Sequence, residues 1–205
     1  MHKPGAPLRE YFMLNMNSVV RLLIMSDVVW MGACGLLGPI FSLYIVEFIQ
    51  GGNEAVAGTA AAIYLVTKSL LQIPAASIID KIRGEKDDFI ILFVGSLIGA
   101  LMPLMYLVVH TPGQLYLVQF VYGAVIAFTF PSYMAIFTRH IDSGHEGKDW
   151  GVYFTLVDLC SAVTAAVGGV IAASVGYRPL ILIMTFISII GVSFLFPIRK
   201  HIFKK

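Results

Sequence analysis

Long apolar stretches alternate with short polar breaks along almost the whole chain. Six of them are long enough to cross a bilayer, which takes roughly 20 mostly apolar residues. They are Val19–Ile49, Ala55–Ile79, Phe89–Val109, Gln114–Phe137, Gly151–Val175 and Leu180–Ile198. The first is too long for the apolar core of a signal peptide, so we interpret it as a membrane helix. The pattern predicts an all-α membrane protein with six transmembrane helices.

The breaks between these stretches carry either turn residues or charges. Residues 50–54, 110–113 and 176–179 are rich in glycine, proline and polar residues, which is typical of tight connections. Residues 80–88 and 139–149 are longer and densely charged. We therefore divide the chain into an N-terminal, interfacial segment (1–18), a six-helix domain (19–198) and a basic tail (199–205).

The distribution of cations predicts the orientation. If the N-terminus is cytoplasmic, that side receives nearly all of the 14 Lys and Arg residues. These are Lys3, Arg9, Arg21, Lys81, Arg83, Lys86, Arg139, Lys148, Arg199, Lys200, Lys204 and Lys205. The opposite side receives Arg178, and Lys68 lies within a helix. Cytoplasmic loops of membrane proteins carry such an excess, so we expect both termini in the cytoplasm. The short loops suit the plasma membrane of a bacterium, its inner membrane.

Composition supports this class and excludes others. Hydrophobic residues make up 58% of the chain and charged residues 13%, where a soluble domain has about 25%. The net charge of +2 and the absence of a basic, aromatic patch argue against nucleic acid. We find no nucleotide-binding loop and no nucleophile motif, so we predict neither a cofactor nor enzymatic activity. Cys34 and Cys160 lie in apolar runs and are interpreted as packing residues.

Glycines and prolines inside the apolar stretches predict close and bent helices. Gly95 and Gly99 form a G-x-x-x-G pair, and small residues recur every four positions through Ala165, Gly169 and Ala173. Such faces let helix backbones approach closely in lipid. The prolines within apolar runs should kink their helices. They are Pro39, Pro74, Pro103 and Pro131.

Three ionisable residues fall within predicted helices: Asp27, Lys68 and Asp158. Each is costly in lipid, by at least about 2.5 kcal/mol at mid-membrane, and is a functional candidate for that reason. Lys68 precedes the end of its helix by roughly 18 Å at about 1.5 Å per residue, which places it near the midplane. We expect a central cation with two carboxylates below it, in which an Asp–Lys pair neutralises the charges. A fixed, purely structural ion pair is the alternative.

Polar neighbours add candidates for a wet path through the helices. Tyr64, Gln72 and Gln119 are suited to bind a solute or a proton, although each also suits an ordinary hydrogen bond between helices. His140 and His145 lie in one charged break, but without metal-ligand spacing. We predict no metal site.

The break after the second helix carries the most specific motif. A helix that ends in Asp80 is followed by Lys81, Gly84 and Lys86. This segment resembles the loop between the second and third helices of the major facilitator superfamily, roughly G-x-x-x-D-R/K-x-G-R/K-R/K. It has Ala76 for the leading glycine, its turn glycine falls one residue late, and Glu85 replaces a basic residue. Pro131, Arg139 and the Gly168–Arg178 region extend the resemblance over nearly the whole chain.

The resemblance implies one six-helix half of a secondary transporter, built as a 3+3 helix repeat. It implies that the first and fourth helices line the cavity, that the third and sixth face lipid, and that the motif residues form a gating loop. Two copies would insert with the same orientation, so we expect a homodimer, or a heterodimer with a second half, that moves a small solute, with or without protons. The alternative is a non-transporting membrane module that assembles another protein. The sequence specifies no substrate.

Overall fold

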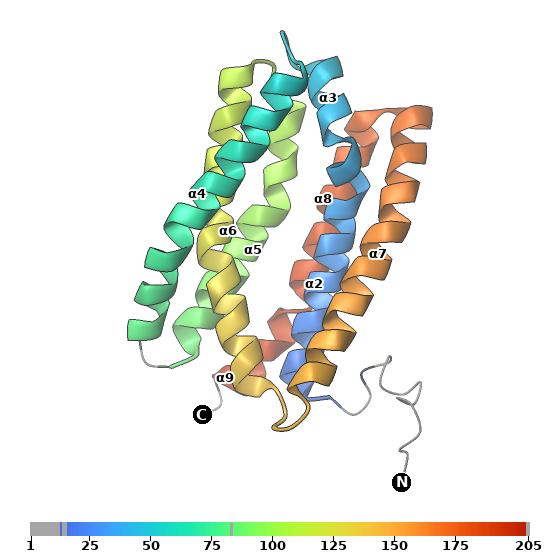
Figure 1. The fold of residues 1–205 in the computed structure, drawn as a ribbon. Helices are drawn as coiled ribbons and strands as arrows, with labels where there is room; N and C mark the ends of the chain where they lie inside the picture. The colour runs from blue at the N-terminus through green and yellow to red at the C-terminus, as the bar shows by residue number, and fades with distance from the viewer. Residues whose placement is uncertain (1–12, 14–15, 83, 204–205) are drawn as a thin grey trace.

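The computed structural model describes residues 13, 16–82 and 84–203, and helices make up nearly all of this part (Figure 1). The N-terminal segment predicted to be interfacial lies mostly outside the described residues. The longer helices are α2 (Ser18–Leu37), α4 (Glu54–Lys81), α5 (Lys86–Leu101), α6 (Pro112–His140), α7 (Glu146–Val175) and α8 (Tyr177–Ser193). The shorter ones are η1 (Gly38–Ile40), α3 (Phe41–Phe48), η2 (Met102–Leu107), η3 (Phe196–Ile198) and α9 (Arg199–Ile202).

Six helical segments of the described chain are long and apolar enough to cross a membrane, as predicted. α4, α6 and α7 are spans by themselves, whereas α2 continues through η1 into α3, α5 into η2, and α8 through η3 into α9. Pro39 and Pro103 lie in the 3₁₀ segments η1 and η2. α4 and α6 continue through Pro74 and Pro131. The chain is therefore an integral membrane protein, and its last span reaches four residues into the predicted basic tail.

Polar residues fix where several helices begin. Asn17 caps α2 by accepting a hydrogen bond from the Val19 amide at 2.8 Å, and Asn53 caps α4 in the same way. Thr111 and Gln114 form a reciprocal capping box at the start of α6. These side chains satisfy amide groups that have no partner within the helix. The helices consequently begin at the polar breaks rather than at the first apolar residue.

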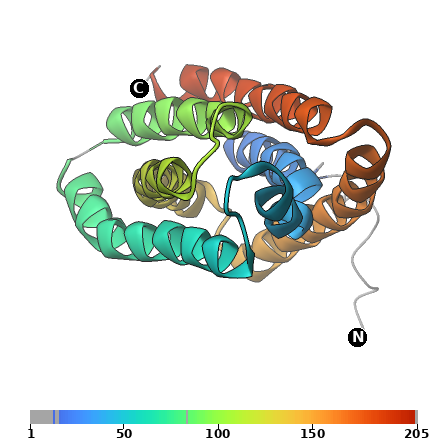
Figure 2. The same cartoon turned by 90° about the horizontal axis from the view of Figure 1, so that it is seen from above.

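The six spans form two groups of three. α6 packs on α4 and α5, while α2 packs on α7 and α8. The groups meet mainly along α5 and α8, and more sparsely between α2 and α6 (Figure 2). Exchanging spans one, two and three for four, five and six reproduces this pattern, which is the 3+3 repeat predicted from the sequence. α5 and α8 form one side of the bundle, and α4 and α7 the other.

Close helix contacts depend on glycines within each group. A Cβ at Gly123 of α6 would lie 2.6 Å from the Tyr64 carbonyl oxygen of α4. A Cβ at Gly168 of α7 would overlap the Leu36 carbonyl of α2. The predicted small face of α7 is one residue out of register, because Gly169 faces open space. The four-residue spacing of small residues in the sequence does not determine which of the two adjacent glycines, Gly168 or Gly169, contacts the neighbouring helix.

Candidate functional site

A cavity of about 530 Å³ lies between the two three-helix groups. Its wall is mostly apolar and aromatic and is drawn largely from α2, α4 and α6, with two residues from η2 and single residues from η1, α3, α7 and α8. Its lining includes Asp27, Trp30, Cys34, Tyr64, Lys68, Gln119, Tyr122, Phe130 and Tyr153. The first and fourth spans thus line a central cavity, as the sequence analysis expected.

Asp27 of α2 is held from the neighbouring helix α7. The Tyr153 hydroxyl donates a hydrogen bond of 2.6 Å to Asp27 Oδ2. Asp27 also borders a second cavity of about 50 Å³ behind it, with Ser26, Ser96 and the hydroxyl-bearing Tyr133 in its wall. The Tyr133 hydroxyl is buried and has no hydrogen-bond partner among the described residues. Asp27 therefore has polar groups on two sides within the membrane span.

Lys68 of α4 lines the same large cavity but is not paired with Asp27. Its Nζ lies 5.1 Å from the centre of the Phe130 ring of α6. No carboxylate in the described part of the chain lies within 4.0 Å of it, so the predicted Asp–Lys ion pair is absent. The physical reason is local: Tyr153 binds one carboxylate oxygen of Asp27, and the face of an aromatic ring attracts the ammonium.

The remaining predicted site residues are divided among three places. Tyr64 and the buried Gln119 line the large cavity. Gln72 instead lines a separate groove of about 510 Å³ between α4 and α6, together with Asp80. Asp158 is exposed on α7 and does not line the cavity, so the expected arrangement of two carboxylates below one cation is wrong.

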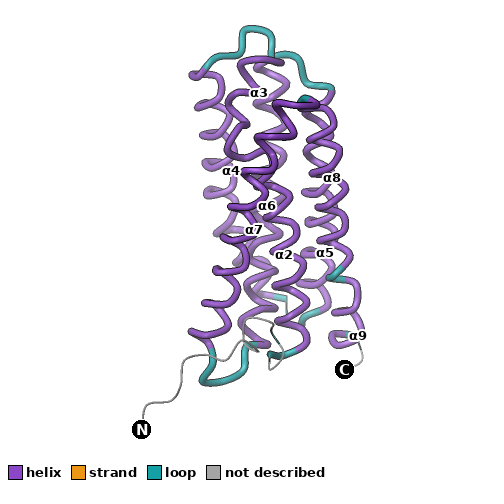
Figure 3. Tube along the Cα trace, turned by 90° about the vertical axis from the view of Figure 1, so that its right-hand side faces the viewer, coloured by secondary structure: helices purple, strands orange, loops and turns teal. Residues whose placement is uncertain are grey.

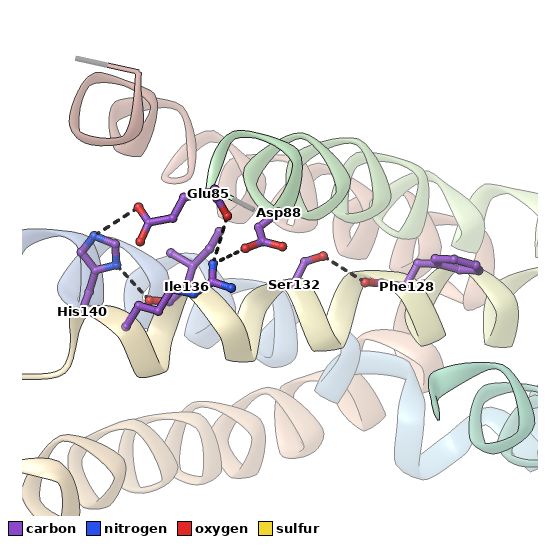
Figure 4. Close-up of polar contacts among 8 residues, drawn as sticks. Glu85, Asp88, Phe128, Ser132, Ile136 and His140 are labelled. Atoms are coloured by element: carbon purple, nitrogen blue, oxygen red, sulfur yellow. Dashed lines mark hydrogen bonds and ion pairs between the residues drawn. The ribbon is translucent and has the colours of Figure 1, made fainter. Parts of the chain in front are cut away.

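Ion pairs and hydrogen bonds connect the α4–α5 loop and the first turn of α5 with the end of α6 (Figure 4). Arg139 forms an ion pair with the buried Asp88 and donates a second hydrogen bond, of 3.4 Å, to the Gly84 carbonyl oxygen. His140 Nε2 lies 3.8 Å from a carboxylate oxygen of Glu85. Of the predicted gating-loop residues, Gly84 takes part through its backbone, whereas Lys81 is exposed and Lys86 lies over Phe203.

Sequence reasoning missed several of these contacts. Arg139 and Asp88 stand at the ends of two antiparallel helices, and opposite charges at such ends are a signal that would have indicated the pair. Tyr153 and Phe130 gave no comparable signal, since aromatic residues are frequent in every span. In the described chain, no three His, Cys, Asp or Glu side chains gather in a way that would hold a metal ion.

Comparison with known proteins places this fold in a family of transporters. Residues 23–202 match the family model described as Major Facilitator Superfamily. A Multidrug resistance protein MdtG of Salmonella dublin is 27% identical in an alignment of 197 positions that covers 87% of this chain and 46% of that protein. The MdtG protein of Salmonella schwarzengrund is 28% identical over 170 residues, 78% of this chain and 39% of its own length. The chain therefore spans about half the length of these relatives.

Proposed function

This chain belongs to the major facilitator superfamily, and on that premise we propose that its six helices form one half of a secondary transporter for a lipophilic organic cation. Transporters of this family bind substrate near the midplane, between two six-helix halves. The observation that carries the proposal is the cavity of about 530 Å³. Its wall is largely aromatic, and Asp27 and Lys68 also line it. A second six-helix unit on the α4–α7 side would complete it.

The high exposure of α4 and α7, each of which packs mainly on one neighbouring helix, supports a partner on that side. In their most apolar stretches, 17% and 11% of the residues are buried, against 33–44% in the other four spans. Asp158 is exposed twelve residues into α7, which is roughly 18 Å from its first residue at about 1.5 Å per residue. A carboxylate at that depth requires water or a protein partner. Lipid alone does not provide either.

The cavity wall favours a large, mainly apolar solute. Trp30, Tyr64, Tyr122 and Phe130 offer ring faces for stacking and for contact with a cationic group. Few polar side chains interrupt this surface, in contrast to what recognition of a sugar or another strongly hydrated solute requires. The Salmonella relatives bear the name Multidrug resistance protein, and we propose by analogy a drug-like solute for this chain. We therefore expect a lipophilic organic cation to be carried.

We assign the coupling role to Asp27. It borders the cavity and has no cation within 4.0 Å in the described chain, so a proton or a cationic solute is needed to neutralise it. The hydroxyl of Tyr153 holds one of its oxygens. Protonation of Asp27 and binding of a cationic solute would then compete for the same carboxylate. We further propose that the end of the bundle containing α9 faces the cytoplasm, because the cations gather there.

Uptake by the purified chain in liposomes tests the transport proposal. We expect ethidium to accumulate when a pH gradient is imposed, and Asp27→Asn and Lys68→Ala each to abolish this accumulation. Asp142→Asn removes an exposed loop carboxylate and is the matched control, which should transport normally. Normal uptake by both cavity variants would refute the site assignment. A chain that associates with itself but moves no dye would favour the non-transporting module.

Disulfide crosslinking tests the α4–α7 interface in a Cys34→Ala, Cys160→Ala background. Leu159 of α7 is 60% exposed and Leu182 of α8 is 53% exposed, and the two helices lie on opposite sides of the bundle. In membranes, Leu159→Cys should form an intermolecular disulfide on oxidation, and Leu182→Cys should not. Equal crosslinking at both sites would contradict the proposed interface between two copies.

A further inference from the structure

An aromatic groove lies on the α5–α8 side of the bundle, away from the cavity. It has a volume of about 270 Å³ and is lined by Phe89, Ile90, Phe93, Phe196, Arg199 and Phe203. Its residues come from α5, from η3 and from the α9 region, which contacts α5. Figure 3 shows α9 beyond α8 at the end of the bundle where the chain ends. Phe196 is 58% exposed and Ile90 is 52% exposed, so the groove opens toward the surroundings of the bundle. In a membrane, those surroundings are lipid.

Two cations from distant parts of the chain meet at the rim of this groove. Lys86 is the first residue of α5, and its Nζ lies 5.6 Å from the centre of the Phe203 ring. Arg199 is the first residue of α9, and its guanidinium carbon also lies 5.6 Å from that centre. In the described chain, neither has a carboxylate within 4.0 Å. The exposed Lys200 follows directly in α9.

The acidic residues beside Lys86 do not neutralise this rim. Asp88 is bound by Arg139, and Glu85 lies near His140, so both are directed toward α6 (Figure 4). Asp87 remains, and one of its carboxylate oxygens is buried without a partner. Lys86, Arg199 and Lys200 thus leave an excess of positive charge at the level where the α5 and α8 spans reach the membrane surface.

We propose that this groove binds one anionic phospholipid. Its phosphate lies between Lys86 and Arg199, and one acyl chain follows Phe93 and Phe196 along the groove. Basic pockets between membrane helices attract acidic head groups, and an apolar groove beneath the cations excludes a freely soluble anion as the main occupant. The ring of Phe203 positions both cations at the rim. Binding of this lipid requires neither transport activity nor a second half.

Native mass spectrometry of the purified full chain tests the proposal. The chain is incubated with phosphatidylglycerol or with phosphatidylcholine of the same acyl chains, and retained lipid is measured. We expect phosphatidylglycerol to be retained preferentially. Lys86→Ala and Arg199→Ala should each weaken its retention about fivefold, and the double variant roughly 25-fold, as expected when each cation acts independently near a membrane surface. Arg178→Ala removes an exposed cation at the opposite end and should have no effect.

Two further measurements separate lipid binding from a purely electrostatic attraction of soluble anions. Phe203→Leu should weaken retention although it changes no charge, whereas Phe203→Tyr should preserve it. Glycerol phosphate at millimolar concentration should displace little phosphatidylglycerol, because it has no acyl chain for the groove. Equal retention of the two lipids, an equal loss in Arg178→Ala, or complete displacement by glycerol phosphate would each overturn the assignment. A transport-inactive sample that still prefers phosphatidylglycerol would leave it intact.

Discussion

A single methyl group at the contact between α2 and α7 should separate these helices. Gly168 of α7 is buried against the backbone of Leu36 in α2. A Cβ at position 168 would lie 2.7 Å from both the carbonyl carbon and the Cα of Leu36, and closer still to the carbonyl oxygen. Because all three are backbone atoms, no side-chain rotation relieves the overlap. A Cβ at Gly169, the next residue, would have no such atom within 4 Å, so this position supplies a matched control.

The size of the effect follows from the overlap. Carbon atoms pack best at about 3.5–4.0 Å, so α7 must move away by roughly 1 Å. A gap of that size forfeits a quarter to a half of the attraction of each atom pair along the contact, and overpacked cores typically lose about 1–3 kcal/mol. We expect Gly168→Ala to destabilise the fold by about 2–3 kcal/mol, in the upper part of that range because the obstacle is backbone. Gly169→Ala should be neutral or stabilising by up to about 1 kcal/mol, because alanine favours a helix interior over glycine and its methyl group meets no neighbour there.

Unfolding in mixed micelles by titration with sodium dodecyl sulfate measures this difference, with helix content followed by circular dichroism. The comparison between the two adjacent glycines matters more than either value alone, because both variants gain the same methyl group on the same helix. If Gly168→Ala and Gly169→Ala unfold at the same point, the close approach of α2 and α7 at this glycine is wrong.

Three further predictions concern the α9 end, the orientation and the lipid-facing side. Arg139→Ala should destabilise the fold by about 2–3 kcal/mol. This is less than the roughly 3–5 kcal/mol lost when a fully buried pair is broken, because the Arg139 side chain is 38% exposed. Adding Asp88→Asn should restore at least about 1 kcal/mol in the same titration. Loss of stability that Asp88→Asn does not relieve would show that the arginine acts in another way. Reporter domains fused at Asn53 and Glu85 should lie outside and inside the cell, respectively, and the reverse result would invert the proposed orientation. In a background without native cysteines, Leu182→Cys on α8 should resist a membrane-impermeant thiol reagent, and rapid labelling would place that side in water.

The positions of the six spans were predictable because hydrophobicity alone determines which segments enter a membrane. The predicted stretch 114–137 lies inside α6, Pro112–His140, and the stretch 151–175 lies inside α7, Glu146–Val175. The structure extends these helices into polar residues, because caps and charged first turns satisfy backbone groups that hydrophobicity does not register. The break at Gly38–Ile40 was predictable only as a consequence of Pro39, which lacks the amide proton that a continuous helix requires.

The contents of the site were predictable only in part. The energetic cost of a charge in lipid identified Asp27 and Lys68 as candidate functional residues, and both line the cavity. The same rule does not give the rotation of a helix about its axis. Asp158, for example, is exposed on α7. Nor does the rule give the extent of the cavity along a helix: Gln72 lies one turn beyond Lys68 on the same face of α4, yet it lines the separate groove between α4 and α6. The partners Tyr153 and Phe130 depend on which helices pack together, and that is a property of the assembled bundle.

The two charged residues of the cavity belong to different three-helix groups. Asp27 and Tyr153 come from α2 and α7, which pack in one group, and Lys68 and Phe130 come from α4 and α6, which pack in the other. Each charged side chain thus contacts an aromatic partner within its own group, and Asp27 and Lys68 line the same cavity between the two groups. The groups are in sparse contact at that point and meet mainly along α5 and α8, on the far side. A solute that contacts both walls would therefore bridge the groups, and a tilt about the α5–α8 contact would change the distance between Asp27 and Lys68 while leaving both aromatic contacts in place.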